Sequence, residues 1–202
     1  TAVALGSGGL RDSLSPGAIH LAMGTHGVAA VRRLEAAHAA QSQALVAAPV
    51  LGRPEAAAAG QLGIVVAGPP AAVGACAPLM EAMGRRSFDA GTDPAGASAI
   101  KLANNFALGC AIEAMAEAFA LVRKLGVSAE VLREVLADGL FDCVAYRTYG
   151  RLIADETYDH VGFSATLALK DVMLVLAAGE AARVPLPGAP RPRSRRPGSA
   201  AS

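Results

Sequence analysis

The sequence predicts an α/β plus all-α fold, in which a layer of strands and helices is followed by helices alone. Over the first 92 residues, short apolar runs of strand length alternate with segments of helical periodicity. Glycine and proline turn signals separate these segments. After Gly91 the strand-like runs cease, and a long stretch without proline indicates a continuous helix.

The strands and helices of the first part are bounded by these turn signals. Residues 62–67 are the clearest strand candidate, because they are rich in β-branched residues and lie between glycines. Pro69 and Pro70 open a helix, since proline is tolerated in a first turn. The expected strands are residues 18–23, 44–50, 62–67 and 86–89, and the expected helices are residues 27–41 and 69–83.

The second part begins with a helix expected over residues 95–125, which is about 45 Å long at the usual rise per residue. Charged residues are sparse along it, so we expect it to be buried on several sides, between domains or between subunits. Gly126 ends this helix, and Ser128 is a favourable N-cap for the next one. Further helices are expected at residues 143–154 and 164–182.

These elements divide the chain into residues 1–92, an all-helical segment over residues 93–184, and a tail over residues 185–202. The tail is rich in proline and arginine and lacks periodicity, which favours a disordered segment. Two alternatives are a basic segment for a membrane or nucleic acid and a frame-shifted end. The frame shift is suggested by the abrupt dominance of residues with GC-rich codons.

Charge and cysteine content narrow the class of partners. The chain has 18 Lys and Arg against 17 Asp and Glu, and this net charge of +1 argues against nucleic acid as a partner. Cys76, Cys110 and Cys143 are far apart and lie among apolar residues, so we expect no disulfide, no metal site and a reducing, cytoplasmic location. Residues 56–80 carry no charge, but glycines and prolines interrupt them, so no membrane span is expected.

Lys101 and Asn105 are the first candidates for chemistry. On a helix they are four residues apart and share a face. Asn104 and Asn105 are costly inside an apolar helix unless they have partners. A lysine in apolar surroundings with an amide one turn away can have a shifted pKa and act in proton transfer. The alternative is a solvated first turn of the helix.

Three further segments are candidates for ligand binding. Residues 48–54 form a loop rich in proline and glycine that follows a strand, and Thr25 lies in a similar strand-to-helix turn. Plain connecting loops explain both equally well. Lys170 and Asp171 lie midway along a helix, where such a pair is usually solvated surface.

Taken together, these segments resemble the β-hydroxyacid dehydrogenases, the group that contains 3-hydroxyisobutyrate and 6-phosphogluconate dehydrogenases. The resemblance runs from Gly24 to Asp171. Its motifs are Gly-Thr after a strand, Ala-Pro-Val-x-Gly, Gly-x-x-x-x-Lys-x-x-Asn-Asn and Phe-x-x-x-Leu-x-x-Lys-Asp. It implies the C-terminal part of a Rossmann-type domain followed by a helical domain led by a long interdomain helix. It also implies a homodimer formed through the helical domain.

The resemblance implies a hydride transfer between NAD or NADP and a small β-hydroxy acid, a small-molecule substrate. Lys101 is then the general acid/base on the substrate hydroxyl, and Asn105 holds the substrate beside it. Thr25 lies near the nicotinamide and the substrate, and Gly52 belongs to the loop that binds the substrate carboxylate.

The same resemblance gives roles to three residues near the last expected helix. Phe163 and Lys170 close over the cofactor, and Asp171 supports the site. The chemistry of the cofactor does not require a metal, and none is expected.

The sequence departs from the family in two places. Leu51-Gly52-Arg53 stands where the family has Ser-Gly-Gly, so Arg53 either binds an acidic substrate or faces solvent. This form is similar to the imine-reductase-like branch, which is the first alternative function. The fingerprint Gly-x-Gly-x-x-Gly is absent, so we expect an N-terminally truncated chain that does not turn over alone. A non-catalytic dimerising remnant is the second alternative.

Overall fold

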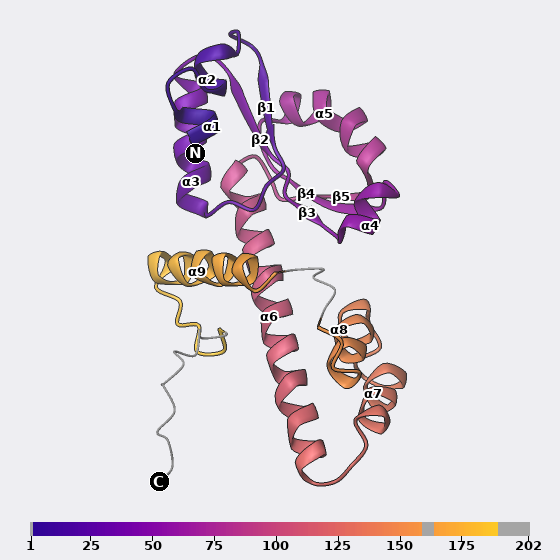
Figure 1. Cartoon of the computed structure of the whole chain (residues 1–202). Helices are drawn as coiled ribbons and strands as arrows, with labels where there is room; N and C mark the ends of the chain where they lie inside the picture. Colours follow the sequence, from indigo (N-terminus) through magenta and orange to yellow (C-terminus); the bar gives the residue numbers. More distant parts are fainter. Residues whose placement is uncertain (1, 159–163, 190–202) are drawn as a thin grey trace. The chain divides into compact units, whose positions relative to one another are not determined.

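A computed structural model describes residues 2–158 and 164–189 of the chain (Figure 1). By its internal contacts the chain forms two units. The first unit contains residues 1–105 and 173–185, and the second contains residues 106–172 and 186–202. The expected segment bounds at residues 92 and 184 remain predictions.

The first unit holds all the described strands and most of the shorter connecting helices. In chain order its elements are α1 (Ala2–Leu5), α2 (Leu10–Ser13), β1 (Ile19–Ala22), α3 (Val28–Ala39), β2 (Ala44–Ala47), β3 (Val50–Leu51), α4 (Pro54–Ala58), β4 (Leu62–Val66), α5 (Pro70–Met83) and β5 (Gly84–Asp89). The long helix α6 (Pro94–Lys124) begins in this unit. The helices α1, α2 and α4 are short additions to the expected pattern.

The strands form a two-stranded sheet, β1–β2, and a three-stranded sheet, β3–β4–β5. β1 pairs with β2 in parallel, and β4 pairs in parallel with β5. β3 pairs antiparallel with β4, and the same register continues to an antiparallel bridge between Ala47 and Ala67. The expected strand over residues 44–50 is therefore divided into β2 and β3, and Pro49, which has no N–H to donate, lies at the interruption.

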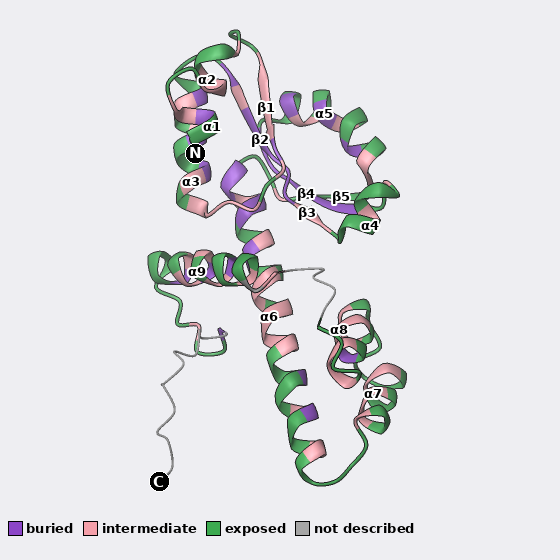
Figure 2. Ribbon diagram, in the orientation of Figure 1, coloured by how far each residue is buried: buried purple, intermediate pink, exposed green. Residues whose placement is uncertain are grey.

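The sheet packs helices on both faces, as an α/β layer does. On one face, Leu62, Ile64 and Val66 of β4 belong to a buried cluster with α5. On the other face, Val65 and Ala67 cluster with α3 and the start of α6. This alternation follows from the period of two along a strand. Figure 2 shows the buried residues concentrated along these strands.

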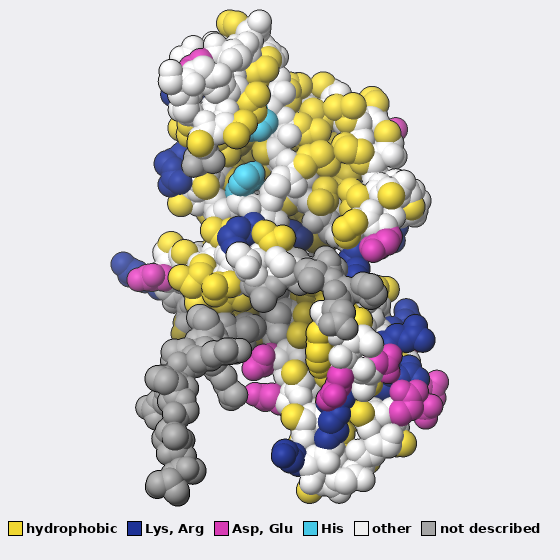
Figure 3. Space-filling model, in the orientation of Figure 1, with side chains coloured by type: hydrophobic (Ala, Val, Ile, Leu, Met, Phe, Trp, Pro, Cys, Tyr) yellow, Lys and Arg dark blue, Asp and Glu magenta, His cyan; other side chains and the backbone are white. Residues whose placement is uncertain are grey.

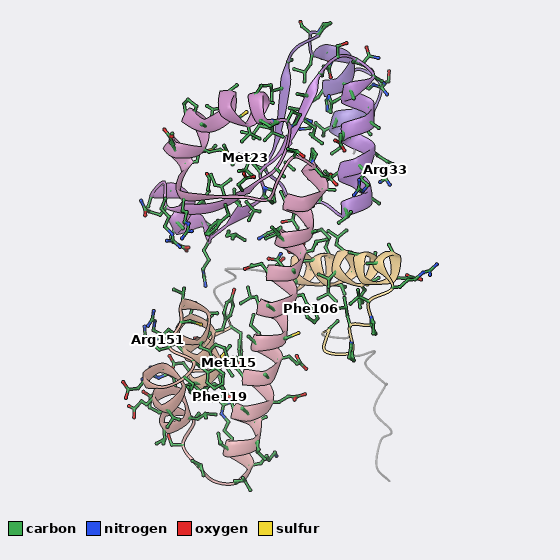
Figure 4. The ribbon with its side chains drawn as sticks, turned by 180° about the vertical axis from the view of Figure 1, so that it is seen from behind. Met23, Arg33, Phe106, Met115, Phe119 and Arg151 are labelled. Carbon is green, nitrogen blue, oxygen red and sulfur yellow. The ribbon has the colours of Figure 1, made fainter. Side chains whose placement is uncertain are left out.

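The second unit is helical. It contains most of α6, together with α7 (Ala129–Asp138), α8 (Val144–Ala154) and the start of α9 (Ala165–Ala182). Met115 and Phe119 are buried on α6, and the Sδ of Met115 lies near Gly150 of α8 (Figure 4). Ser128 caps α7, as expected, by accepting a hydrogen bond from the Glu130 N–H.

The helix expected over residues 95–125 is confirmed as α6, which is 31 residues long. Among the described helices it is long and apolar enough to cross a membrane, and 11% of its most apolar window is buried. Length and composition alone do not separate a spanning helix from one that packs against protein. Its first turn, with Ala95 and Ala97, is buried in the core of the first unit.

Candidate active site

Lys101 is positioned by the way α6 begins. Asp93 accepts a hydrogen bond from the Ala95 N–H (2.9 Å) and also pairs with Arg32 of α3 (3.0 Å). Ala97 is fully buried, and Lys101 lies one turn beyond it on the same face of α6, about 6 Å along the helix axis. The start of the helix is therefore held in the core while Lys101 extends past it, half-buried.

The strand ends that meet α6 supply the rest of the candidate site. Ala97 belongs to the same buried cluster as Ala22 at the end of β1 and Ala47 at the end of β2. β1 and β2 are parallel, so the segments that follow them emerge at the same edge of the sheet. This edge is where open α/β sheets bind their ligands. The start of α6 and the turn that carries Thr25 therefore lie at one end of the first unit.

Asn105 follows Lys101 by one further turn and is also half-buried, whereas Asn104 is exposed. The Asn104 side-chain N–H donates a long hydrogen bond to Oδ1 of Asn105 (3.4 Å). The two asparagines are thus unequal, and Asn105 is the one on the Lys101 face.

Thr25 lies in the turn between β1 and α3. Gly27 is the N-cap of α3, and the first N–H groups of this 12-residue helix follow it. A Cβ at Gly24 would lie 3.0 Å from Nε2 of His26, and a Cβ at Gly27 would lie 3.1 Å from Leu174. The turn is therefore tightly filled, and Thr25 within it is half-buried.

Gly52 and Arg53 follow β3, and Gly52 lies beside Leu62 at the start of β4. Gly52 has φ +151°, and a Cβ there would lie 2.8 Å from Leu62, so the loop requires glycine at this position. Arg53 is the N-cap residue of α4, and its side chain is 42% exposed. Its Nε lies 3.7 Å from Glu55, which is a loose ion pair at the surface.

Leu51 packs against the buried cluster on the α3 face of the sheet. Leu51, which stands where the family has serine, is thus packed against other apolar side chains. Its side chain offers no hydrogen-bond donor.

Lys170 and Asp171 belong to the second unit. Lys170 Nζ lies 3.1 Å from Asp171 Oδ1, and the two side chains are 48% and 10% exposed. The interpretation as a solvated pair therefore fits Lys170 and is wrong for Asp171, which is buried. The expected cofactor-binding residue Phe163 lies outside the described residues.

The sequence-based prediction missed a chain of polar side chains in the first unit. His20 on β1, His38 on α3 and Gln43 before β2 are joined by hydrogen bonds. Burial, followed by the nearby His38 and His26, holds the pKa of His20 below its ordinary value.

Burial likewise raises the pKa of the Cys76 thiol, as expected for a core cysteine. Among the described residues, no group of three or more His, Cys, Asp or Glu could hold a metal ion.

Two family models cover nearly the whole chain. Residues 1–91 match the NAD binding domain of 6-phosphogluconate dehydrogenase. Residues 95–191 match the domain described as the NAD-binding region of NADP-dependent 3-hydroxyisobutyrate dehydrogenase.

Relatives and solved structures agree with these models. The uncharacterised oxidoreductase YfjR of Bacillus subtilis is 38% identical over 185 residues, which cover 92% of this chain and 64% of the relative. A 3-hydroxyisobutyrate dehydrogenase of Pseudomonas aeruginosa is 35% identical over 77% of this chain and 54% of its own length. A crystal structure of 3-hydroxyisobutyrate dehydrogenase from Salmonella typhimurium has a TM-score of 0.80 at 25% identity, covering 90% of this chain and 63% of that chain.

This chain therefore spans less than two thirds of the length of these relatives. The expected α/β plus helical fold is confirmed. With its motifs, its fold and these matches in agreement, the chain belongs to the β-hydroxyacid dehydrogenase family, whose members are NAD(P)-dependent oxidoreductases.

Proposed function

We propose that the chain carries the catalytic residues of a 3-hydroxyisobutyrate-type dehydrogenase that transfers a hydride between NAD(P) and a small β-hydroxy acid. The observation that carries this proposal is the placement of Lys101 and Asn105. They share one face of α6, and Lys101 lies one turn beyond the buried Ala97, which clusters with Ala22 and Ala47 at the ends of β1 and β2. A base and an amide held this way suit a substrate that carries a hydroxyl and a carboxylate.

In this proposal Lys101 removes the proton from the substrate hydroxyl during oxidation and returns it during reduction. Asn105 holds the substrate beside the lysine, one turn away. The backbone around Gly52 receives the substrate carboxylate, and Arg53 adds a positive charge at the mouth of the loop. The nicotinamide supplies the hydride chemistry when it is bound.

The residues present fit one end of such a cofactor. The turn from Gly24 to Gly27 is followed by the N–H groups of α3, and donors at a helix N-terminus suit a polar or negatively charged ligand. Thr25 in this turn would face the nicotinamide end. The 202 residues contain no Gly-x-Gly-x-x-Gly turn for the pyrophosphate.

For this reason we propose that the 202-residue chain alone binds NAD(P) weakly and does not turn over. Isothermal titration of the chain with NADH and NADPH should give no micromolar affinity. A micromolar dissociation constant for either cofactor would show that this proposal is wrong.

Activity is tested on the chain together with any segment that the genomic reading frame encodes upstream of Thr1. Oxidation of small β-hydroxy acids is followed at NAD⁺ or NADP⁺, and Lys101→Met should lower kcat by about 10²–10⁴-fold. Asn105→Ala should impair turnover, whereas the neighbouring exposed Asn104→Ala should leave it near the parent value. Equal effects of the two asparagine variants would contradict the proposed role of Asn105.

Leu51 and Arg53 favour one alternative, an imine-reductase-like activity. Leu51 is packed against the core and supplies no donor to a carboxylate. Assay of the same protein with a cyclic imine and NADPH distinguishes the two functions. The alternative would be favoured if imine reduction were faster than β-hydroxy acid oxidation and if Arg53→Ala left the rate of imine reduction unchanged.

A further inference from the structure

A chain of hydrogen-bonded side chains runs through the first unit, apart from the proposed catalytic residues. His38 is fully buried, and its two ring nitrogens lie 2.9 Å from Nδ1 of His20 and 2.6 Å from Oε1 of Gln43. Gln43 is also buried, and its side-chain N–H group donates to the carbonyls of Arg11 (3.0 Å) and Leu14 (2.7 Å). These hydrogen bonds therefore tie Arg11 in α2 and Leu14 just after it to α3 and β1.

The partners fix where each proton lies. Because the Gln43 amide nitrogen donates to two carbonyls, its oxygen must be the acceptor, and His38 Nδ1 must carry the hydrogen. The other nitrogen of a neutral His38, Nε2, then accepts from His20 Nδ1–H. This leaves Nε2 of His20 as the one ring nitrogen in the chain with an available lone pair.

The hydrogen-bonded chain of His20, His38 and Gln43 can consequently accept one further proton. A proton on Nε2 of His38 would place two N–H groups opposite each other at 2.9 Å unless His20 moved its own hydrogen from Nδ1 to Nε2. A proton on Nε2 of His20 can be carried with the Nδ1 donor still in place, at the cost of a positive charge on a half-buried ring. His20 is only half-buried, whereas His38 is fully buried, and exposure therefore also favours protonation at His20.

The surroundings of His20 oppose its positive charge. Burial, His38 from α3 and His26 from the loop after β1 all lower the pKa of His20. On the α2 side the chain meets neutral backbone carbonyls, and the charged side chains there, Arg11 and Asp12, pair with each other at 2.7 Å. Figure 3 shows histidine side chains reaching the surface of the first unit, where a charged ring could be hydrated.

We propose that Gln43, His38 and His20 form a one-proton switch that ties the ends of α2 to α3 and β1 while His20 is neutral, and loosens them when His20 is protonated. If the charged ring turns toward water, the buried Nε2 of His38 loses its donor, and an unsatisfied buried acceptor weakens the rest of the chain. β1 leads directly into the turn that carries Thr25 and His26. Acid is thereby sensed four residues before the turn that we assign to cofactor binding, although the switch does not depend on that assignment.

The first test locates the protons in the 202-residue chain itself. The chain has four histidines, and long-range ¹H–¹⁵N NMR spectra can assign each by single His→Gln substitutions. Neutral His38 should carry its hydrogen on Nδ1. His20 should take a proton at Nε2 with a midpoint below about 6.5, the ordinary value. A hydrogen on Nε2 of neutral His38, or a midpoint of His20 at or above about 6.5, would overturn the proposal.

The second test asks whether that proton loosens the α2 segment. Amide exchange at residues 10–14 is measured between pH 8 and pH 5, relative to buried amides of β4 in the same sample. Protection at residues 10–14 should fall by several-fold on acidification in the parent chain and show no such fall in His20→Gln. His26→Gln is the matched control. The loss of protection should persist in this variant but begin at a higher pH, because removal of one repelling histidine raises the midpoint of His20. An unchanged pH response in His20→Gln would refute the switch.

Discussion

At the scale of single residues, Gly52 shows how closely the loop after β3 is fitted. Its φ of +151° is rarely adopted by other residues, and a Cβ would lie within 3.2 Å of both Leu62 and Ala56. We expect Gly52→Ala to lower the free energy of unfolding by about 1–3 kcal/mol. Thermal or denaturant unfolding of the purified chain measures the change.

Gly74 provides the matched control for this substitution. It lies inside α5, and a Cβ added there meets nothing within 4 Å. Gly74→Ala should therefore stabilise the chain by about 0.5–1 kcal/mol, the usual difference in helix propensity. If both variants changed stability in the same direction, the requirement for glycine at position 52 would be unsupported.

The stability of the chain should also depend on pH through His20. Its pKa is lowered in the folded state, mainly by burial, so between that value and about 6.5 the unfolded chain binds more protons than the folded one. The free energy of unfolding should therefore fall as the pH drops through this window and level off below the folded pKa. Denaturation curves from pH 8 to pH 5 measure it, and His20→Gln should flatten the profile.

At the scale of elements, Arg123 joins α6 to the end of α8. Its Nη2 donates to the carbonyls of Ile153 (2.7 Å) and Ala154 (3.1 Å), and Nη1 lies 3.4 Å from Glu156. Arg123→Met keeps the apolar stem but removes these donors, so it should cost about 1–3 kcal/mol of stability.

Arg133 is the control for Arg123. It pairs with Glu130 one turn away on the surface of α7, where an ion pair contributes little. Arg133→Met should change the unfolding free energy by no more than about 0.5 kcal/mol. Comparable losses in the two variants would mean that the hydrogen bonds from Arg123 to the end of α8 stabilise the chain no more than a surface ion pair does.

The elements also show what sequence alone could predict. The long helix α6 was predictable because no proline interrupts it, and β4 because β-branched residues lie between glycines. The division between β2 and β3 was not, although Pro49 was visible, because the antiparallel partner that continues past it is found only in the folded sheet.

The candidate site divides in the same way. Lys101 and Asn105 were found because their spacing on one helix is a local property. The partners in the His20–His38–Gln43 chain lie up to 32 residues apart and leave no periodic pattern in the sequence. The burial of Asp171 was missed because a neighbouring Lys-Asp pair has the same sequence whether it is solvated or packed.

At the scale of the whole molecule, apolar side chains remain exposed on the helices of the second unit. Leu121 and Leu125 near the end of α6, Val135 of α7 and Val144 of α8 are each 60–72% exposed. We propose that a second copy of the chain covers this helical surface, which would make the protein a homodimer.

The dimer is tested by light scattering coupled to size-exclusion chromatography. The parent chain should have twice the monomer mass, and Leu121→Glu should shift it to monomer because a charge would be buried in the interface. Leu79→Glu changes an equally exposed leucine on α5 of the first unit and should leave the mass unchanged. A monomeric parent chain would exclude the proposed homodimer.

The contact that seats α6 on the sheet is built largely from alanines. Ala95 and Ala97 share a buried cluster with Ala22, Ala47 and Ala67. Side chains this small let backbones come close together, and an added methylene in such a packed contact forces a neighbour to move. Exchange of alanine for valine or glycine at this contact would therefore move Lys101 in small steps relative to the loops. No residue that meets the substrate would have to change. The alanine-rich contact thus allows the distances within the proposed site to change through substitutions at buried residues outside that site.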